Sequence, residues 1–212
     1  MTILALEFSS VQRSVAVARA GRVAEAIETG AGATNAFAMI ERVLAEANIE
    51  REEVDVLAVG LGPGSYTGIR AAISMAQGWQ LARNVKLLGL ESVEAIVSQA
   101  HTLHITASCH VVIDAQRNEF YLATYQIDSD GWREIAPLRI VAQAEVQARA
   151  GAGELMIGPE AHRWCGRVLF PRAGALAEMA VRRSGYVSGE KLAPIYLRET
   201  SFIKSPPRRA LS

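Results

Sequence analysis

An element order that occurs twice places the tightest limit on the fold of this chain. In the first series, apolar alternation predicts three antiparallel strands, over residues 3–8, 14–18 and 23–27. The second series starts at His110, with strands over residues 111–113, 119–127 and 133–141. The first strand of each series closes on an acidic residue, Glu7 in one and Asp114 in the other. The repeat predicts an α/β protein of two similar lobes that meet at a cleft.

Helices and further strands follow each meander. In the first series we expect a helix from Thr34 or Asn35, a strand over 54–59, a helix ending near 83, a strand over 86–90 and a helix from 92. In the second series we expect a helix over 143–150, a strand over 155–157 and a helix over 175–183. The predicted domains are therefore a first lobe over 1–104, a smaller lobe over 105–190, and a C-terminal segment and tail over 191–212.

The balance of charge argues against broad electrostatic binding. The 22 basic residues equal the 22 acidic ones, so no net field draws the chain toward nucleic acid or an anionic membrane. The N-terminus lacks a signal-peptide pattern and no apolar run is long enough to span a membrane, so we expect a cytoplasmic protein. The basic C-terminal residues Lys204, Arg208 and Arg209 favour a solvated tail over a binding arm.

A glycine-rich junction stands between the predicted strand over 54–59 and the next helix. Glycine reaches positive φ without cost and lets another backbone approach closely, so the sequence predicts a built turn. Ser65 or Thr67 can cap the helix that follows. Two interpretations of the junction remain open: an anion site at the N-terminus of the helix, or a tight turn that packs the helix on the sheet. The residues of this glycine loop are Gly60, Gly62, Pro63, Gly64, Ser65, Thr67, Gly68 and Arg70.

Neither common nucleotide loop fits this junction. A Walker loop needs a lysine after its last glycine, and here Ile69 and Arg70 follow Gly68. A dinucleotide fingerprint needs a third glycine where Ser65 stands.

The helix after the glycine loop has two apolar edges where a sheet needs only one. Small residues keep the second edge low enough for another helix to approach, so it predicts a subunit interface that the first helix extends; the alternative is that the second lobe covers it. The predicted partner-binding residues are Phe37, Met39, Ala71, Ser74, Met75, Gly78, Trp79 and Ala82.

Other chemistry-bearing residues favour no catalytic site. His101, His104, Cys109 and His110 form the one cluster with metal-ligand chemistry, but no carboxylate accompanies them, and we expect no metal. Ser9, Ser10 and Ser65 lack a nucleophile elbow.

A vestigial nucleotide cleft is the remaining possibility. Glu7, Ser9 and Asp114 are its candidate residues, because cleft-facing carboxylates in duplicated lobes can hold Mg²⁺ and phosphates. No glycine turn follows either predicted first strand, so we expect no resident cofactor and at most weak or vestigial binding of ATP and Mg²⁺.

Three strings resemble the signatures of the bacterial TsaB (YeaZ) family. They are, in chain order, Gly60-Leu-Gly-Pro-Gly-Ser-Tyr-Thr-Gly-Ile-Arg70, Val112-Ile-Asp-Ala-Gln-Arg-Asn-Glu-Phe-Tyr121 and Pro194-Ile-Tyr-Leu-Arg198. The resemblance implies two RNase H-like lobes of the actin-like and Hsp70-like ATPase (ASKHA) fold, in agreement with the repeat.

The function that the resemblance implies is that of an accessory subunit. Family members support formation of N6-threonylcarbamoyladenosine (t6A) in tRNA, while the paralogue TsaD, whose paired histidines bind metal, transfers the threonylcarbamoyl group. The resemblance further implies a heterodimer with TsaD through the first two helices, TsaE joining the complex, a homodimer when the chain is alone, and indirect contact with tRNA. No His-x-x-x-His pair is present here, which fits the accessory role.

Two departures from the family pattern weaken a nucleotide site further. Glu7-Phe8-Ser9 stands where the family usually has Asp-Thr-Ser, and Thr34-Asn35-Ala36 stands where a histidine is often found. The competing hypothesis is an actin-like ATPase or kinase that holds Mg-ATP between the lobes through Glu7 and Asp114.

Overall fold

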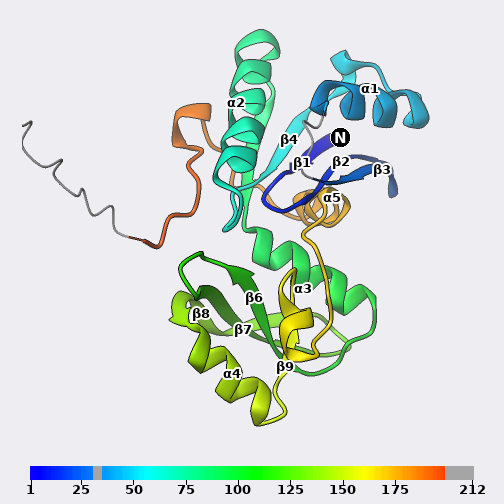
Figure 1. Cartoon of the computed structure of the whole chain (residues 1–212). Helices are drawn as coiled ribbons and strands as arrows, with labels where there is room; N and C mark the ends of the chain where they lie inside the picture. The colour runs from blue at the N-terminus through cyan, green and yellow to red at the C-terminus, as the bar shows by residue number, and fades with distance from the viewer. Residues whose placement is uncertain (31–34, 199–212) are drawn as a thin grey trace, which may run out of the picture.

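Five strands form the first sheet of the computed structural model, which describes residues 1–30 and 35–198 (Figure 1). They are β1 (Thr2–Glu7), β2 (Gln12–Arg19), β3 (Arg22–Thr29), β4 (Val56–Gly60) and β5 (Lys86–Leu90). Their order across the sheet is β3-β2-β1-β4-β5. The meander β1-β2-β3 is antiparallel, whereas β4 runs parallel to β1 and β5 runs parallel to β4.

Helices cover both faces of this sheet. Successive side chains along a strand therefore alternate between two buried cores, one on each face. Leu4 and Leu6 of β1 point to the face covered by α1 (Ala36–Ala47) and α2 (Tyr66–Arg83). Ile3 and Ala5 point to the opposite face, where α5 (Ala173–Val181) packs. The sheet is thus the middle layer of a three-layer α/β arrangement.

The second sheet has four strands and a hydrophobic core on each face. Its strands are β6 (Ser108–Asp114), β7 (Glu119–Ile127), β8 (Trp132–Ala142) and β9 (Leu155–Ile157), in the order β8-β7-β6-β9. One face packs on α4 (Gln143–Gly151) and the short 3-10 helix η2 (Ala161–Trp164). The strands β6, β7 and β9 repeat the connectivity of β1, β2 and β4, as the sequence repeat predicts.

The helix α3 (Ser92–Thr102) lies between the two sheets (Figure 1). Its residues Ile96 and Val97 belong to the core of the second sheet, while Ala95 belongs to the core shared with α5. The chain also returns to the first sheet at α5, after it has completed β9. The division into 1–104, 105–190 and 191–212 stays a prediction, and α5 is the element that ties its middle segment to the first sheet.

The predicted element order is confirmed, and most boundaries differ by a few residues. Three strands match the sequence prediction residue for residue: β5, β7 and β9. The first helix begins after Asn35, whose side chain accepts a hydrogen bond from the Ala38 amide at 3.1 Å. Thr34 and the basic tail with Lys204, Arg208 and Arg209 lie outside the described residues.

Two further short helices complete the described chain: η1 (Arg51–Glu53) and η3 (Gly189–Lys191). Within residues 1–30 and 35–198, no helix combines the length and the apolar character that a membrane crossing requires.

Candidate functional site

The outer face of α2 is the first candidate surface. Ser65 caps the helix by accepting a hydrogen bond from the Gly68 amide at 3.3 Å. The inner face packs on the first sheet through Gly68, Ile69, Ala72, Ile73 and Ala76. The predicted small residues Ala71, Ser74, Gly78 and Ala82 are all exposed on the outer face. The helix therefore presents a low outer surface, as expected for close approach by another helix.

The large predicted anchors are placed less favourably than the small residues. Met75 and Trp79 are half-buried and pack against the core of the first sheet. Phe37 on α1 is 65% exposed, as an interface residue requires. Met39 is 1% exposed and belongs to that core, so its assignment to the surface was wrong. The sequence pattern also indicates burial of Met39, because Met39 precedes Val43 by one helical turn and lies on the same buried stripe.

The helical periodicity of the sequence did not single out two exposed side chains on α2. Leu81 is 90% exposed and Tyr66 is 58% exposed. Both lie outside the two apolar edges, so neither stripe included them. The signal was their position, since a large apolar side chain on the polar side of a surface helix has no core to enter.

Charge is sparse on this helix. Its 18 residues include Arg70 and Arg83 and no acidic residue. Arg83 pairs with Glu52 at 3.0 Å, so Arg70 remains as the cation without a carboxylate partner among the described residues. Arg149 on α4, unlike Arg70, forms ion pairs with two carboxylates, those of Glu145 and Glu154. The outer face of α2 is thus unusually apolar and uncharged for a helix exposed to water.

Gly78 adds an independent sign of a partner. A Cβ at this position would meet no atom within 4 Å, so nothing in the described chain requires glycine there. A glycine inside a helix costs about 1 kcal/mol relative to alanine. Its small size therefore serves no contact among the described residues and suits close approach by a second surface.

The glycine loop, by contrast, is filled by its own chain. A Cβ at Gly60 would collide with the Glu7 carboxylate, one at Gly64 with the Ser9 carbonyl, and one at Gly68 with the Phe8 carbonyl. Gly64 also has a φ of 146°, a conformation that favours glycine. These glycines let the loop and the start of α2 close over the residues that follow β1.

The loop amides are also occupied. Leu61 donates to the Leu90 carbonyl at 2.8 Å, Gly62 to the Ser92 hydroxyl at 3.1 Å and Ser65 to the Ser9 carbonyl at 2.6 Å. Pro63 is buried, whereas Thr67 and Arg70 are exposed. Of the two alternatives that the sequence left open, the geometry fits the packed turn, because those amides already have acceptors in the chain.

Glu7 lies beneath this loop and is fully buried at 0% exposure. It accepts hydrogen bonds from the Ser9 amide and the Ser92 hydroxyl, each at 2.7 Å. Burial raises the pKa of Glu7, and the hydrogen bonds from Ser9 and Ser92 oppose that rise. The carboxylate acts as an internal acceptor that joins β1 to the start of α3.

Asp114 has a separate set of partners in the second lobe. Its carboxylate accepts hydrogen bonds from the Gln116 amide at 2.7 Å and the Gln116 side chain at 3.2 Å. Glu160 accepts a hydrogen bond from the Asp114 amide at 3.1 Å, and burial raises the pKa of Glu160. Glu7 and Asp114 therefore share no hydrogen-bond partner, and Ser9 is buried beside the glycine loop.

The histidine and cysteine cluster does not converge. His101 lies beside Trp132, with ring centroids 5.6 Å apart, and His104 is exposed. Cys109 is buried in the core, while His110 contacts Thr124 and Glu154. In the described part of the chain, no group of three or more His, Cys, Asp or Glu side chains is placed to hold a metal ion.

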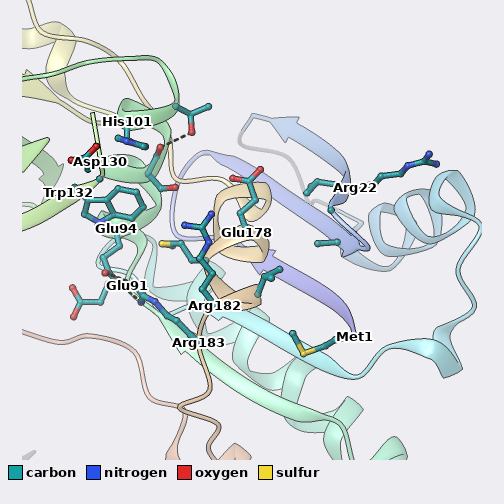
Figure 2. Close-up of a pocket in the computed structure, with 18 of the residues that line it drawn as sticks. Met1, Arg22, Glu91, Glu94, His101, Asp130, Trp132, Glu178, Arg182 and Arg183 are labelled. Atoms are coloured by element: carbon teal, nitrogen blue, oxygen red, sulfur yellow. Dashed lines mark hydrogen bonds and ion pairs between the residues drawn. The ribbon is translucent and has the colours of Figure 1, made fainter. Parts of the chain in front are cut away.

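A groove of about 1090 Å³ has His101 in its lining but none of the other members of this cluster (Figure 2). The β2–β3 turn, α3, α5 and the β7–β8 turn line it. Arg183 crosses it and donates to both Glu94 carboxylate oxygens at 2.8 Å. Burial raises the pKa of Glu91 nearby, and the neighbouring Glu94 and Glu134 raise it further. None of the predicted partner, glycine-loop or nucleotide residues lines this groove.

Comparisons with known proteins identify the family. The family model described as "TsaD: tRNA N6-adenosine threonylcarbamoyltransferase" matches residues 31–200. The tRNA threonylcarbamoyladenosine biosynthesis protein TsaB of Haemophilus influenzae is 28% identical, with 98% of each chain covered. TsaB of Escherichia coli is 26% identical over 80% of this chain and 81% of its own.

Solved structures agree with the sequence matches. YeaZ from Pseudomonas aeruginosa superposes with a TM-score of 0.79 at 27% identity, covering 92% of this chain and 99% of that one. The predicted fold of two RNase H-like lobes of the ASKHA type is confirmed by this match and by the two sheets. This chain belongs to the TsaD family of tRNA N6-adenosine threonylcarbamoyltransferases, as one of its TsaB (YeaZ) members in t6A biosynthesis.

Proposed function

We propose that this chain is a non-catalytic accessory subunit that pairs with its TsaD paralogue and activates it in t6A formation. The outer face of α2 is the observation that carries the proposal. It is low, nearly uncharged and marked by Leu81 and Gly78, neither of which the described chain uses in its own packing. A surface of this kind is costly to leave in water and favourable to bury.

The assembly that we propose has further members. TsaE joins the pair, the chain forms a homodimer through the same surface when TsaD is absent, and tRNA is reached through the complex. The site of action is the cytoplasm. The family and the small residues on α2 support these proposals.

We propose no resident cofactor for the chain alone. A Mg-ATP site that used Glu7 would need its carboxylate at a solvent-filled cleft, and Glu7 is instead buried with two donors bound to it. Gly60 lies directly over that carboxylate. Calorimetry with Mg-ATP tests this point: no micromolar binding is expected, whereas binding that an Asp114→Ala variant abolishes would support the ATPase or kinase alternative.

The test of pairing uses the exposed residues rather than the half-buried ones. Charged substitutions of Trp79 or Met75 would also disturb the core on which both side chains pack. Leu81→Glu and Phe37→Glu avoid this problem because both side chains are mostly exposed. Ile135→Glu is the matched control, since Ile135 is 52% exposed on β8 in the second lobe.

The expected result is that Leu81→Glu and Phe37→Glu lose co-purification with TsaD and keep the wild-type melting temperature. Ile135→Glu should behave as wild type in both measurements. Normal co-purification of both α1 and α2 variants would overturn the proposed surface. Failure of the wild-type chain to bind TsaD would overturn the proposed function itself.

A further inference from the structure

Two tyrosines hold an arginine in place at the N-terminal end of α2. The Arg70 guanidinium carbon lies 5.0 Å from the centroid of the Tyr66 ring, and its Nη1 donates to the Tyr66 hydroxyl at 2.6 Å. The Tyr196 ring packs beside Tyr66, with centroids 5.9 Å apart. The pKa of Arg70 is raised, first by hydrogen bonding to Tyr196 and then by its electrostatic interaction with Tyr66. The guanidinium makes these contacts although Arg70 is exposed to solvent.

The position of Tyr196 is fixed by the segment around it, which runs from the side of α2 toward the second lobe (Figure 1). Leu192 is buried in the core of the first sheet, and the Ile195 amide donates to the Leu61 carbonyl at 2.9 Å. Arg198 donates to the Ala115 carbonyl at 2.9 Å and to Glu119 at 2.6 Å. Tyr196 is thus anchored on both sides, yet 52% of it stays exposed.

Arg70 lacks the carboxylate partner that Arg83 has on the same helix. Within residues 1–30 and 35–198, no carboxylate lies within 4 Å of Arg70. Arg83 on the same helix pairs with Glu52, and Arg198 pairs with Glu119. An arginine fork matches a carboxylate through two parallel hydrogen bonds. Because Tyr66 and Tyr196 already hold the side chain, little further ordering is needed when a carboxylate binds.

We propose that Arg70, held by Tyr66 and Tyr196, receives a carboxylate side chain of the protein that covers the outer face of α2. This inference rests on the proposed function, because it takes TsaD as that protein. Tyrosine and arginine are also the residue types that dominate binding energy at protein interfaces.

A protein carboxylate fits this site better than an RNA phosphate does. Arg70 and Arg83 are the basic residues of α2, and Arg83 is already paired. The chain as a whole carries no net charge. Nucleic-acid surfaces instead gather many lysines and arginines on one face, because affinity comes from several phosphate contacts together.

The test is titration calorimetry of the full chain with purified TsaD at low and high salt. Arg70→Ala should weaken binding on the order of tenfold and reduce its salt dependence. Arg70→Lys should restore part of the loss, because it keeps the charge but not the planar fork. Tyr66→Phe should weaken binding by roughly threefold, since it removes the hydroxyl that accepts a hydrogen bond from the arginine.

Two control variants distinguish a carboxylate of TsaD from a general effect of charge and from a carboxylate of this chain. Arg133→Ala removes an exposed arginine of β8 and should bind TsaD as wild type. Glu199→Gln tests a carboxylate of this chain that lies outside the described residues, and it should also leave binding unchanged. Melting temperatures of all variants should match wild type, because Arg70 is exposed.

Three results would overturn the inference while the proposed function stands. The first is wild-type affinity and salt dependence for Arg70→Ala. The second is a Glu199→Gln variant that loses affinity as Arg70→Ala does, which would place the carboxylate in this chain. The third is an Arg70→Ala variant that binds TsaD normally but loses affinity for tRNA, which would point to a phosphate. Absence of any wild-type binding to TsaD would refute the proposed function instead.

Discussion

Two glycines on the same helix have opposite surroundings. A Cβ on Gly68 would collide with the Phe8 carbonyl, whereas a Cβ on Gly78 would meet nothing within 4 Å. Gly68 is buried against the chain that follows β1, and Gly78 is exposed on the outer face. The fold of this chain thus requires the first glycine, whereas no contact within residues 1–30 and 35–198 requires the second.

The same contrast separates the glycine loop from the outer face of α2. In the loop, backbone amides and the Glu7 carboxylate already have partners in the chain. On the outer face, Leu81 extends into solvent, and Arg70 contacts Tyr66 but has no carboxylate partner among the described residues. The glycine loop therefore packs within the chain, while the candidate binding surface lies on α2, the helix that follows it.

The largest expected effect is that of Gly68→Ala. The added methyl group meets a backbone carbonyl that cannot move without shifting β1, so the free energy of unfolding should fall by about 3 kcal/mol. Chemical denaturation with a fitted midpoint and slope measures this change. A loss below about 1 kcal/mol would break the comparison, because the loop would then yield to a side chain.

The ionisation of Glu7 should give the next effect. Its pKa is raised in the folded state, so between about pH 4.5 and that raised pKa the native state binds more protons than the unfolded state. The stability of wild type should therefore fall as the pH rises through this window, and it should level off above the raised pKa.

Glu7→Gln removes this titration and keeps groups that can hydrogen-bond to Ser9 and Ser92. Its free energy of unfolding, relative to wild type, should increase as the pH rises from about 4.5 toward neutrality. Denaturation curves at several pH values measure the difference. A constant difference across the range would show that folding does not raise the pKa of Glu7, which would contradict the effect of burial described here.

The smallest expected effect on stability is that of Gly78→Ala. Since the added methyl group meets nothing, the higher helix propensity of alanine should raise the free energy of unfolding by up to about 1 kcal/mol. The same variant should bind TsaD less tightly, because the methyl group occupies space left for the partner. A variant that is destabilised, or that is stabilised and binds TsaD as well as wild type, would refute this role for Gly78.

The fold was largely predictable because its signals are local. Short apolar segments between turns located β5, β7 and β9 to the residue, and Asn35 marked the start of α1. The repeat predicted two similar lobes, and in the structure each lobe has a sheet with a parallel strand beside its first strand. The return of α5 to the first sheet was not predictable in this way, because only contacts between segments far apart in sequence decide it.

The candidate site was predictable only in part. Sequence periodicity found the small outer residues of α2, but it misplaced Met39 and omitted Leu81 and Tyr66. Half-burial of Trp79 depends on how α2 rotates on the sheet, which composition does not reveal. The cluster of Arg70 with Tyr196 joins residues far apart in the chain, so spacing could not show it.

Hydroxyl-radical footprinting tests most directly whether TsaD covers the outer face of α2, because it reports the solvent exposure of single side chains. In the isolated chain at low concentration, Phe37 and Leu81 should react readily, in line with their exposed fractions of 65% and 90%. When TsaD is added, both should become protected, while Ile135 on β8 should react as before. Unchanged reactivity of Phe37 and Leu81 in a complex that has demonstrably formed would contradict the account.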